Sequence, residues 1–128
     1  MQGTATFRSL QGRWEGDGRE GNGPRRRCTI TITGSSLRLY RDTNYWFETT
    51  FTLPAGTDPQ EIQATIHAAS HRDHLGEVVF GILKLKGGTR TLAALDHPGK
   101  LPKDFADEQY SLYEVRRADR GRGRGRQR

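Results

Sequence analysis

Three histidines form the most suggestive chemical pattern in this sequence. His67, His71 and His74 are four and three residues apart, so on a helix they would share one face and could bind a metal ion, with Asp73 as a further ligand. The fourth histidine, His97, lies far along the chain. If the segment is a strand followed by a turn, that shared face does not exist. We therefore favour solvent-exposed histidines and expect no metal and no cofactor.

The inventory of nucleophiles is short. Cys28 is the only cysteine, which excludes an internal disulfide and a zinc site built from several cysteines. It alternates with Ile30 and Ile32, so we expect a small buried side chain rather than a reactive thiol. The sequence contains no nucleophile elbow, phosphate-binding loop or paired-carboxylate motif. We predict that the protein is not an enzyme.

An aromatic group offers a different kind of site. Trp46 stands between Tyr45 and Phe47, on the polar side of its expected strand, and Tyr40 is close in the sequence. Exposed tryptophan beside tyrosine is typical of a ligand or partner contact patch. Simple packing under a loop explains the same residues equally well, so both interpretations stay open for Tyr40, Tyr45 and Trp46.

Positive charge is concentrated at the C-terminus. The formal net charge is +6, and the seven arginines and single aspartate between Arg116 and Arg128 account for the whole excess. Residues 118–128 form an arginine–glycine segment that we expect to be disordered and to contact RNA or another polyanion. A solubilising tail or a membrane-surface tether is the alternative, and residues 25–27 offer a second basic contact. The arginines expected to bind are Arg120, Arg122, Arg124, Arg126 and Arg128.

Short alternating segments must position these residues. Residues 27–33 alternate apolar side chains with threonine, which is the strongest strand signal in the chain. Similar patterns, separated by turn residues, predict about eight antiparallel strands in an up-and-down barrel or a sandwich over residues 1–117. We expect turns at 17–18, 21–24 and 87–88 and a polar loop over 96–108. The other expected strands cover residues 11–15, 37–41, 45–53, 76–86, 90–95 and 110–117.

Residues 58–74 admit two interpretations. Asp58, Pro59 and a following glutamate resemble a helix start, after which Ile62 and Ile66 could form a helical stripe. The same residues also alternate as in a strand. We favour the strand, because it keeps a regular succession of neighbouring strands, with a turn over 71–75.

The start of the chain predicts its compartment. Residues 1–10 lack the apolar region of a secretory signal, and no apolar run approaches the length of a membrane span. We therefore expect a soluble protein in the reducing cytoplasm.

Several motifs resemble one family in an ordered set. Residues 10–14 (LQGRW), 81–92 (GILKLKGGTRTL) and 100–105 (KLPKDF) are similar to segments of the lipocalin-like domains of planctomycete-type bacteria. The resemblance implies a lipocalin-like barrel of about eight strands. It also implies that Trp14 plugs one end, with Arg117 or Arg116 of the last strand over its face. No agreed activity comes with the family.

Three hypotheses of function follow. We favour a non-catalytic binding module, whose barrel engages a partner such as a protein while the tail contacts RNA or another polyanion. The alternative is a carrier of a small hydrophobic ligand in the barrel interior. The third, a metal-dependent enzyme, would require His67, His71 and His74 to converge.

Overall fold

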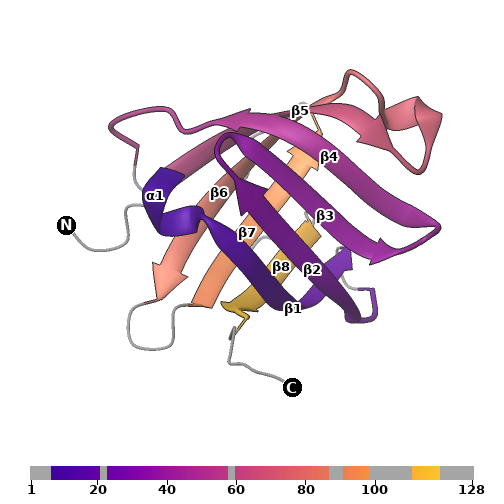
Figure 1. The fold of residues 1–128 in the computed structure, drawn as a ribbon, viewed down its shortest axis with the longest axis horizontal. Helices are drawn as coiled ribbons and strands as arrows, with labels where there is room; N and C mark the ends of the chain where they lie inside the picture. Colours follow the sequence, from indigo (N-terminus) through magenta and orange to yellow (C-terminus); the bar gives the residue numbers. More distant parts are fainter. Residues whose placement is uncertain (1–6, 21–22, 58–59, 87–90, 99–110, 119–128) are drawn as a thin grey trace.

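The computed structural model describes residues 7–20, 23–57, 60–86, 91–98 and 111–118. In this part of the chain eight strands pair in sequence order, and the last pairs with the first to close a barrel (Figure 1). All eight pairings are antiparallel, which confirms the expected all-β antiparallel fold. The elements are α1 (Phe7–Leu10), β1 (Gly12–Glu20), β2 (Arg26–Thr33), β3 (Ser36–Asp42), β4 (Tyr45–Thr52), β5 (Gln60–Ala69), the short 3₁₀ helix η1 (Arg72–His74), β6 (Val78–Lys86), β7 (Thr91–Pro98) and β8 (Ser111–Arg117).

Alternation of side chains builds the core of the barrel. In β2 the side chains of Cys28, Ile30 and Ile32 are buried inside, while Thr31 and Thr33 are exposed outside. Successive side chains of a strand point to opposite faces, so inward and outward side chains alternate along each strand of a barrel.

The turn predicted at residues 17–18 is absent, because β1 continues to Glu20. Gly16 lies opposite Val115 of β8, and a Cβ added to Gly16 would stand 2.2 Å from the Glu114 carbonyl oxygen. A Cβ added to Gly18 would stand 2.6 Å from the Tyr113 ring. These glycines allow two strands to approach closely, and they are not turn residues.

The strand interpretation of the ambiguous segment is confirmed, since β5 runs from Gln60 to Ala69. Its start is held by polar contacts: the buried Gln60 side-chain amide donates to the Pro54 carbonyl at 2.8 Å, and the Glu61 N–H donates to Thr57 Oγ1 at 2.9 Å. Residues 58–59, which suggested a helix start, lie outside the described residues.

Two further expectations need correction. The loop predicted from residue 96 begins too early, because β7 extends to Pro98 and His97 pairs with Phe80 across the sheet. The short helix α1 was not predicted from its polar sequence. The expected turn at 87–88, the segment 100–105 and the tail 119–128 lie outside the described residues.

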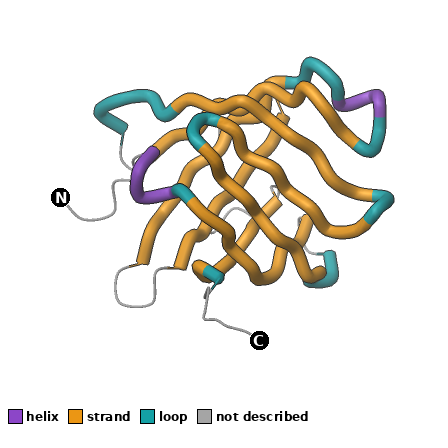
Figure 2. The backbone as a smooth tube through the Cα atoms, in the orientation of Figure 1, coloured by secondary structure: helices purple, strands orange, loops and turns teal. Residues whose placement is uncertain are grey.

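The connections gather at the two ends of the barrel. Figure 2 shows α1, the β2–β3 turn and the β4–β5 loop together at the left, with the β3–β4 turn and η1 at the right. We call the end that carries α1 the closed end and the opposite end the open end. The ring of Phe7 in α1 lies 5.1 Å from that of Phe51, and Leu10 is fully buried, so α1 covers the closed end.

Candidate functional site

The closed end is sealed by Trp14 and Arg117. The guanidinium carbon of Arg117 lies 4.3 Å from the centre of the Trp14 ring, as expected for a cation over an indole face. Arg117 also donates to the Ser9 carbonyl at 2.8 Å and to the Gln11 carbonyl. The indole N–H of the fully buried Trp14 donates to the Leu10 carbonyl at 2.9 Å. The last strand therefore locks both α1 and the first strand.

Gly12, two residues before Trp14, has a backbone conformation that favours glycine. Its φ of +117° is a conformation that side chains rarely adopt, and an added Cβ would stand 2.8 Å from Nη1 of Arg117. Gln11 beside it accepts a hydrogen bond from the Gly34 N–H at 2.6 Å. Of the two arginines considered for the contact with Trp14, Arg117 makes it and Arg116 is exposed.

The open end is hollow. Two adjoining cavities, each of about 180 Å³, share the lining residues Glu20, Tyr45 and Tyr113. The first cavity lies against β1, β2 and β3, and the second reaches Ile66 of β5 and Val79 of β6. Strands from opposite sides of the barrel thus enclose one interior space at this end.

The floor of this space is apolar. A third cavity of about 50 Å³ lies deeper and shares Leu39 with the first cavity, and Phe47 and Val79 with the second. Its lining is aliphatic or aromatic apart from Thr49 and the hydroxyl of Tyr113. The interior therefore changes from a polar mouth to an apolar floor, as in pockets that hold amphipathic ligands.

The mouth of the first cavity carries positive charge. Among the described residues, three arginines (Arg19, Arg26 and Arg41) and one acidic residue, Glu20, line it. Arg41 lies over the ring of Tyr45, with the guanidinium carbon 4.2 Å from the ring centre. The charge at this mouth favours an anionic group over a cationic one.

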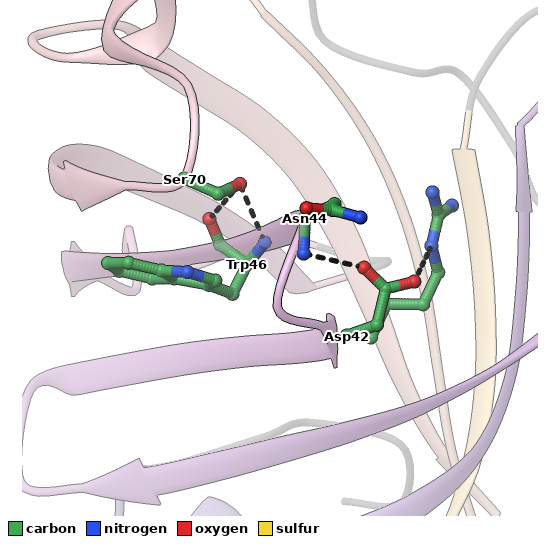
Figure 3. A network of polar contacts seen from close by, with 5 residues as sticks. Asp42, Asn44, Trp46 and Ser70 are labelled. Atoms are coloured by element: carbon green, nitrogen blue, oxygen red, sulfur yellow. Dashed lines mark hydrogen bonds and ion pairs between the residues drawn. The ribbon is translucent and has the colours of Figure 1, made fainter.

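Asp42 contacts Arg41 only loosely. Its Oδ2 lies 4.0 Å from Arg41 Nε, and its Oδ1 accepts the Asn44 N–H at 2.8 Å (Figure 3). The Nε of Arg41 is buried and makes no hydrogen bond. Among the described residues that line this cavity, Arg41 has the only buried side-chain nitrogen without a hydrogen bond.

Cys28 lines the first cavity at its inner wall, with 3% of its surface exposed. Burial raises the pKa of its thiol to about 11, and the nearby Asp17 carboxylate adds to the rise. The expected burial of Cys28 is confirmed, and its low reactivity stays a prediction.

The predicted aromatic patch is divided between two faces. Tyr40 and Trp46 face each other across β3 and β4, and Arg38 lies 5.7 Å from each ring. Tyr45 packs against the core and lines both cavities instead. The single patch was therefore wrong, because neighbours on a strand point to opposite faces. The backbone of Trp46 is held by Ser70, whose Oγ accepts its N–H at 3.0 Å (Figure 3).

The three histidines share no helix face, because β5 is a strand. His67 and His71 are exposed, and Nδ1 of His74 lies 3.1 Å from Glu77 Oε1. In the described ranges no three or more His, Cys, Asp or Glu side chains converge in a way that could hold a metal ion. None of the helices described is long and apolar enough to cross a membrane.

Arg41 is the functional candidate that sequence reasoning missed. The alternation of Leu37, Leu39 and Arg41 already places this arginine on the inner face of its strand. A charged residue at the end of an apolar face was the available signal. Glu20 and Tyr113 gave no comparable signal, because their meeting depends on the pairing of β1 with β8.

Comparisons of the chain with family models, with curated proteins and with solved structures found no match. The site is therefore interpreted from its own geometry, and the resemblance to lipocalin-like domains stays a prediction.

Proposed function

We propose that this protein is a non-catalytic binding module that takes a small, mainly apolar ligand into the open end of its barrel. The observation that carries the proposal is the pair of adjoining cavities of about 180 Å³ above an apolar floor. An apolar cavity of about 150 Å³ holds benzene. Each cavity thus accommodates a group of about that size, and the pair suits a short chain or a small ring system.

We also propose that the barrel is of the lipocalin-like type. Two features support this assignment. Each strand pairs with its neighbours in the sequence and β8 closes on β1, and an arginine of the last strand covers Trp14 of the first. A ligand site at the end opposite Trp14 is consistent with that architecture.

The thiol of the first cavity is not poised for nucleophilic chemistry. Cys28 lines this cavity, and a pKa of about 11 keeps its thiol protonated at neutral pH. A thiolate, not a thiol, is needed for nucleophilic attack.

The test is calorimetric titration of the full chain with 1-octanol. We expect saturable binding with one site and a Kd on the order of 100 µM. Val79 lines the second and third cavities, so Val79→Phe should narrow them and weaken binding about tenfold. The matched control is Val78→Phe, because Val78 is 39% exposed and lies on the other face of β6. Equal binding by both variants, or no binding by the native protein, would refute the proposal.

A second binding function belongs to the C-terminal segment. We propose that the arginines from Arg120 to Arg128 contact RNA or another polyanion, because this end of the chain holds the whole net charge of +6. A protein partner on the barrel and a cytoplasmic location remain predictions.

A further inference from the structure

We infer that the ligand of the barrel carries an anionic head group, which binds Arg41 at the mouth while the apolar part extends towards Val79. This inference rests on the proposed function and adds the chemical class of the ligand: a carboxylate, sulfonate or phosphate monoester on a short apolar body.

The Arg41 side chain has a hydrogen-bond donor without an acceptor. This side chain is only 26% exposed, and its Nε is buried without a hydrogen-bond partner. A guanidinium has no acceptor capacity, so each buried N–H needs an oxygen from elsewhere. Leaving such a donor without an acceptor carries the cost of its lost hydration.

The nearby carboxylate does not supply that oxygen. Asp42 Oδ2 is 4.0 Å from Arg41 Nε, too far for a hydrogen bond, and the Asp42 side chain is 55% exposed. Its other oxygen already accepts the Asn44 N–H. Asp42 therefore pairs with the charge of Arg41 but leaves its Nε without a hydrogen bond.

The second argument is the position of the guanidinium group. The guanidinium carbon lies 4.2 Å from the centre of the Tyr45 ring, a contact that restricts where the side chain can lie. A planar fork held in this way matches the two oxygens of a carboxylate or phosphate. Because Arg41 and Leu39 both line the first cavity, an anion at the fork would stand directly above apolar surface.

The third argument is the polarity of the whole space. Of the residues that the structure describes, three arginines and one glutamate line the first cavity, whereas the third cavity is lined almost entirely by apolar side chains. A ligand that is charged at both ends, or neutral throughout, would leave one of these regions unmatched. An anionic head with an apolar body matches both.

The experiment compares octanoate with 1-octanol by calorimetric titration of the full chain at neutral pH. The native protein should bind octanoate at least about tenfold more tightly, because a charge-assisted hydrogen bond distinguishes the two probes. Arg41→Gln should remove this preference, so that the variant binds octanoate and 1-octanol with similar affinities. Arg41→Lys should retain part of the preference, because it keeps the charge and loses the fork.

The matched control is Arg38→Gln. This substitution removes the same charge from the same strand, but the Arg38 side chain lies on the outer face with Tyr40 and Trp46. It also controls for attraction of octanoate to the basic C-terminal segment, which every variant retains. We expect Arg38→Gln to bind both probes as the native protein does.

The outcomes separate the two proposals. Equal affinity for both probes, or an equal loss in Arg38→Gln and Arg41→Gln, overturns the anionic head group and leaves the binding module standing. Absence of binding to either probe overturns the proposed function itself.

Discussion

Two arginines of this barrel stack on aromatic rings in nearly the same way and yet differ in their hydrogen bonds. Arg117 lies 4.3 Å from the Trp14 ring and Arg41 lies 4.2 Å from the Tyr45 ring. Arg117 donates from both of its Nη atoms to backbone carbonyls, although its Nε, like the Nε of Arg41, is buried without a hydrogen bond. Arg117 thus anchors the closed end through its Nη contacts, and Arg41 is the arginine for which we propose a ligand contact.

The stabilising role predicts a large effect of Arg117→Ala. The variant should lose about 2–4 kcal/mol of unfolding free energy, because the two carbonyl contacts and the indole contact disappear together. Urea denaturation measures this loss. Arg116→Ala removes an exposed neighbour on the same strand and should change stability by less than about 0.5 kcal/mol. Similar losses in the two variants would contradict the role given to Arg117.

The burial of Cys28 predicts slow thiol chemistry. Its pKa of about 11, against 9.0 for an ordinary thiol, lowers the thiolate fraction of the folded protein near pH 8 by about 100-fold. Reaction with a chromogenic disulfide reagent should be slower by at least that factor in buffer than in guanidinium chloride. A native rate within about tenfold of the denatured rate would show that the thiol is not held in this way.

The raised pKa of Cys28 also makes the stability of the folded state depend on pH. The folded state holds the proton more tightly than the unfolded state, so the contribution of Cys28 is fully present below pH 9. It is lost as the pH rises from 9 through 11. Cys28→Ser should remove this part of the alkaline destabilisation in denaturation experiments across that range.

At the residue scale the sequence predicts the inner and outer faces well, because alternation is a local property. Cys28 was correctly expected inside the barrel. Trp46 and Tyr45 were grouped by proximity in the sequence, although the same alternation separates them. Arg41 shows the same limit, since its inner position follows from the pattern while its missing partner depends on the geometry of the β3–β4 turn.

At the scale of elements, β1 and β5 show what a local pattern can and cannot predict. In β5 the alternation over ten residues correctly outweighed a helix-like start. In β1 glycine was read as a turn signal, yet Gly16 and Gly18 permit contact with β8, which lies at the other end of the chain. A local signal cannot reveal a distant partner, so this error follows from the topology.

The close approach of β1 and β8 predicts that Gly16→Ala is strongly destabilising. A Cβ at 2.2 Å from a backbone oxygen forces the two strands apart, and we expect a loss of about 3 kcal/mol or more. Gly34→Ala is the control for backbone strain. Its φ is +60° with open space around the added Cβ, so it should cost only about 1 kcal/mol in the same denaturation experiment. A smaller loss for Gly16→Ala than for Gly34→Ala would contradict the close approach.

At the scale of the whole molecule, the barrel has one sealed end and one hollow end. Sequence reasoning predicted the antiparallel sheet, because strands and turns are local. It did not predict where the interior is filled, because cavity space depends on which side chains of distant strands meet. The net charge of residues 1–115 is zero, so the surplus positive charge of the chain lies in residues 116–128.

The basic segment predicts a salt-dependent affinity for single-stranded RNA. If it contacts about four phosphates, log K should fall with a slope near −3 against log salt concentration. Deletion of residues 119–128 should flatten this dependence, and it should leave 1-octanol binding unchanged. Undiminished RNA binding after the deletion would exclude the segment as the RNA contact.

Methyl NMR can locate the ligand that we propose for the open end of the barrel. Titration of the full chain with 1-octanol should shift the methyl signals of Leu39, Ile66 and Val79 in a saturable manner, because these residues line the three cavities. Signals of Leu10 and Ile32, which are buried in the core outside these cavities, should stay in place. Unchanged signals at Leu39, Ile66 and Val79, with shifts confined to the exposed Leu75 and Val78, would contradict the account.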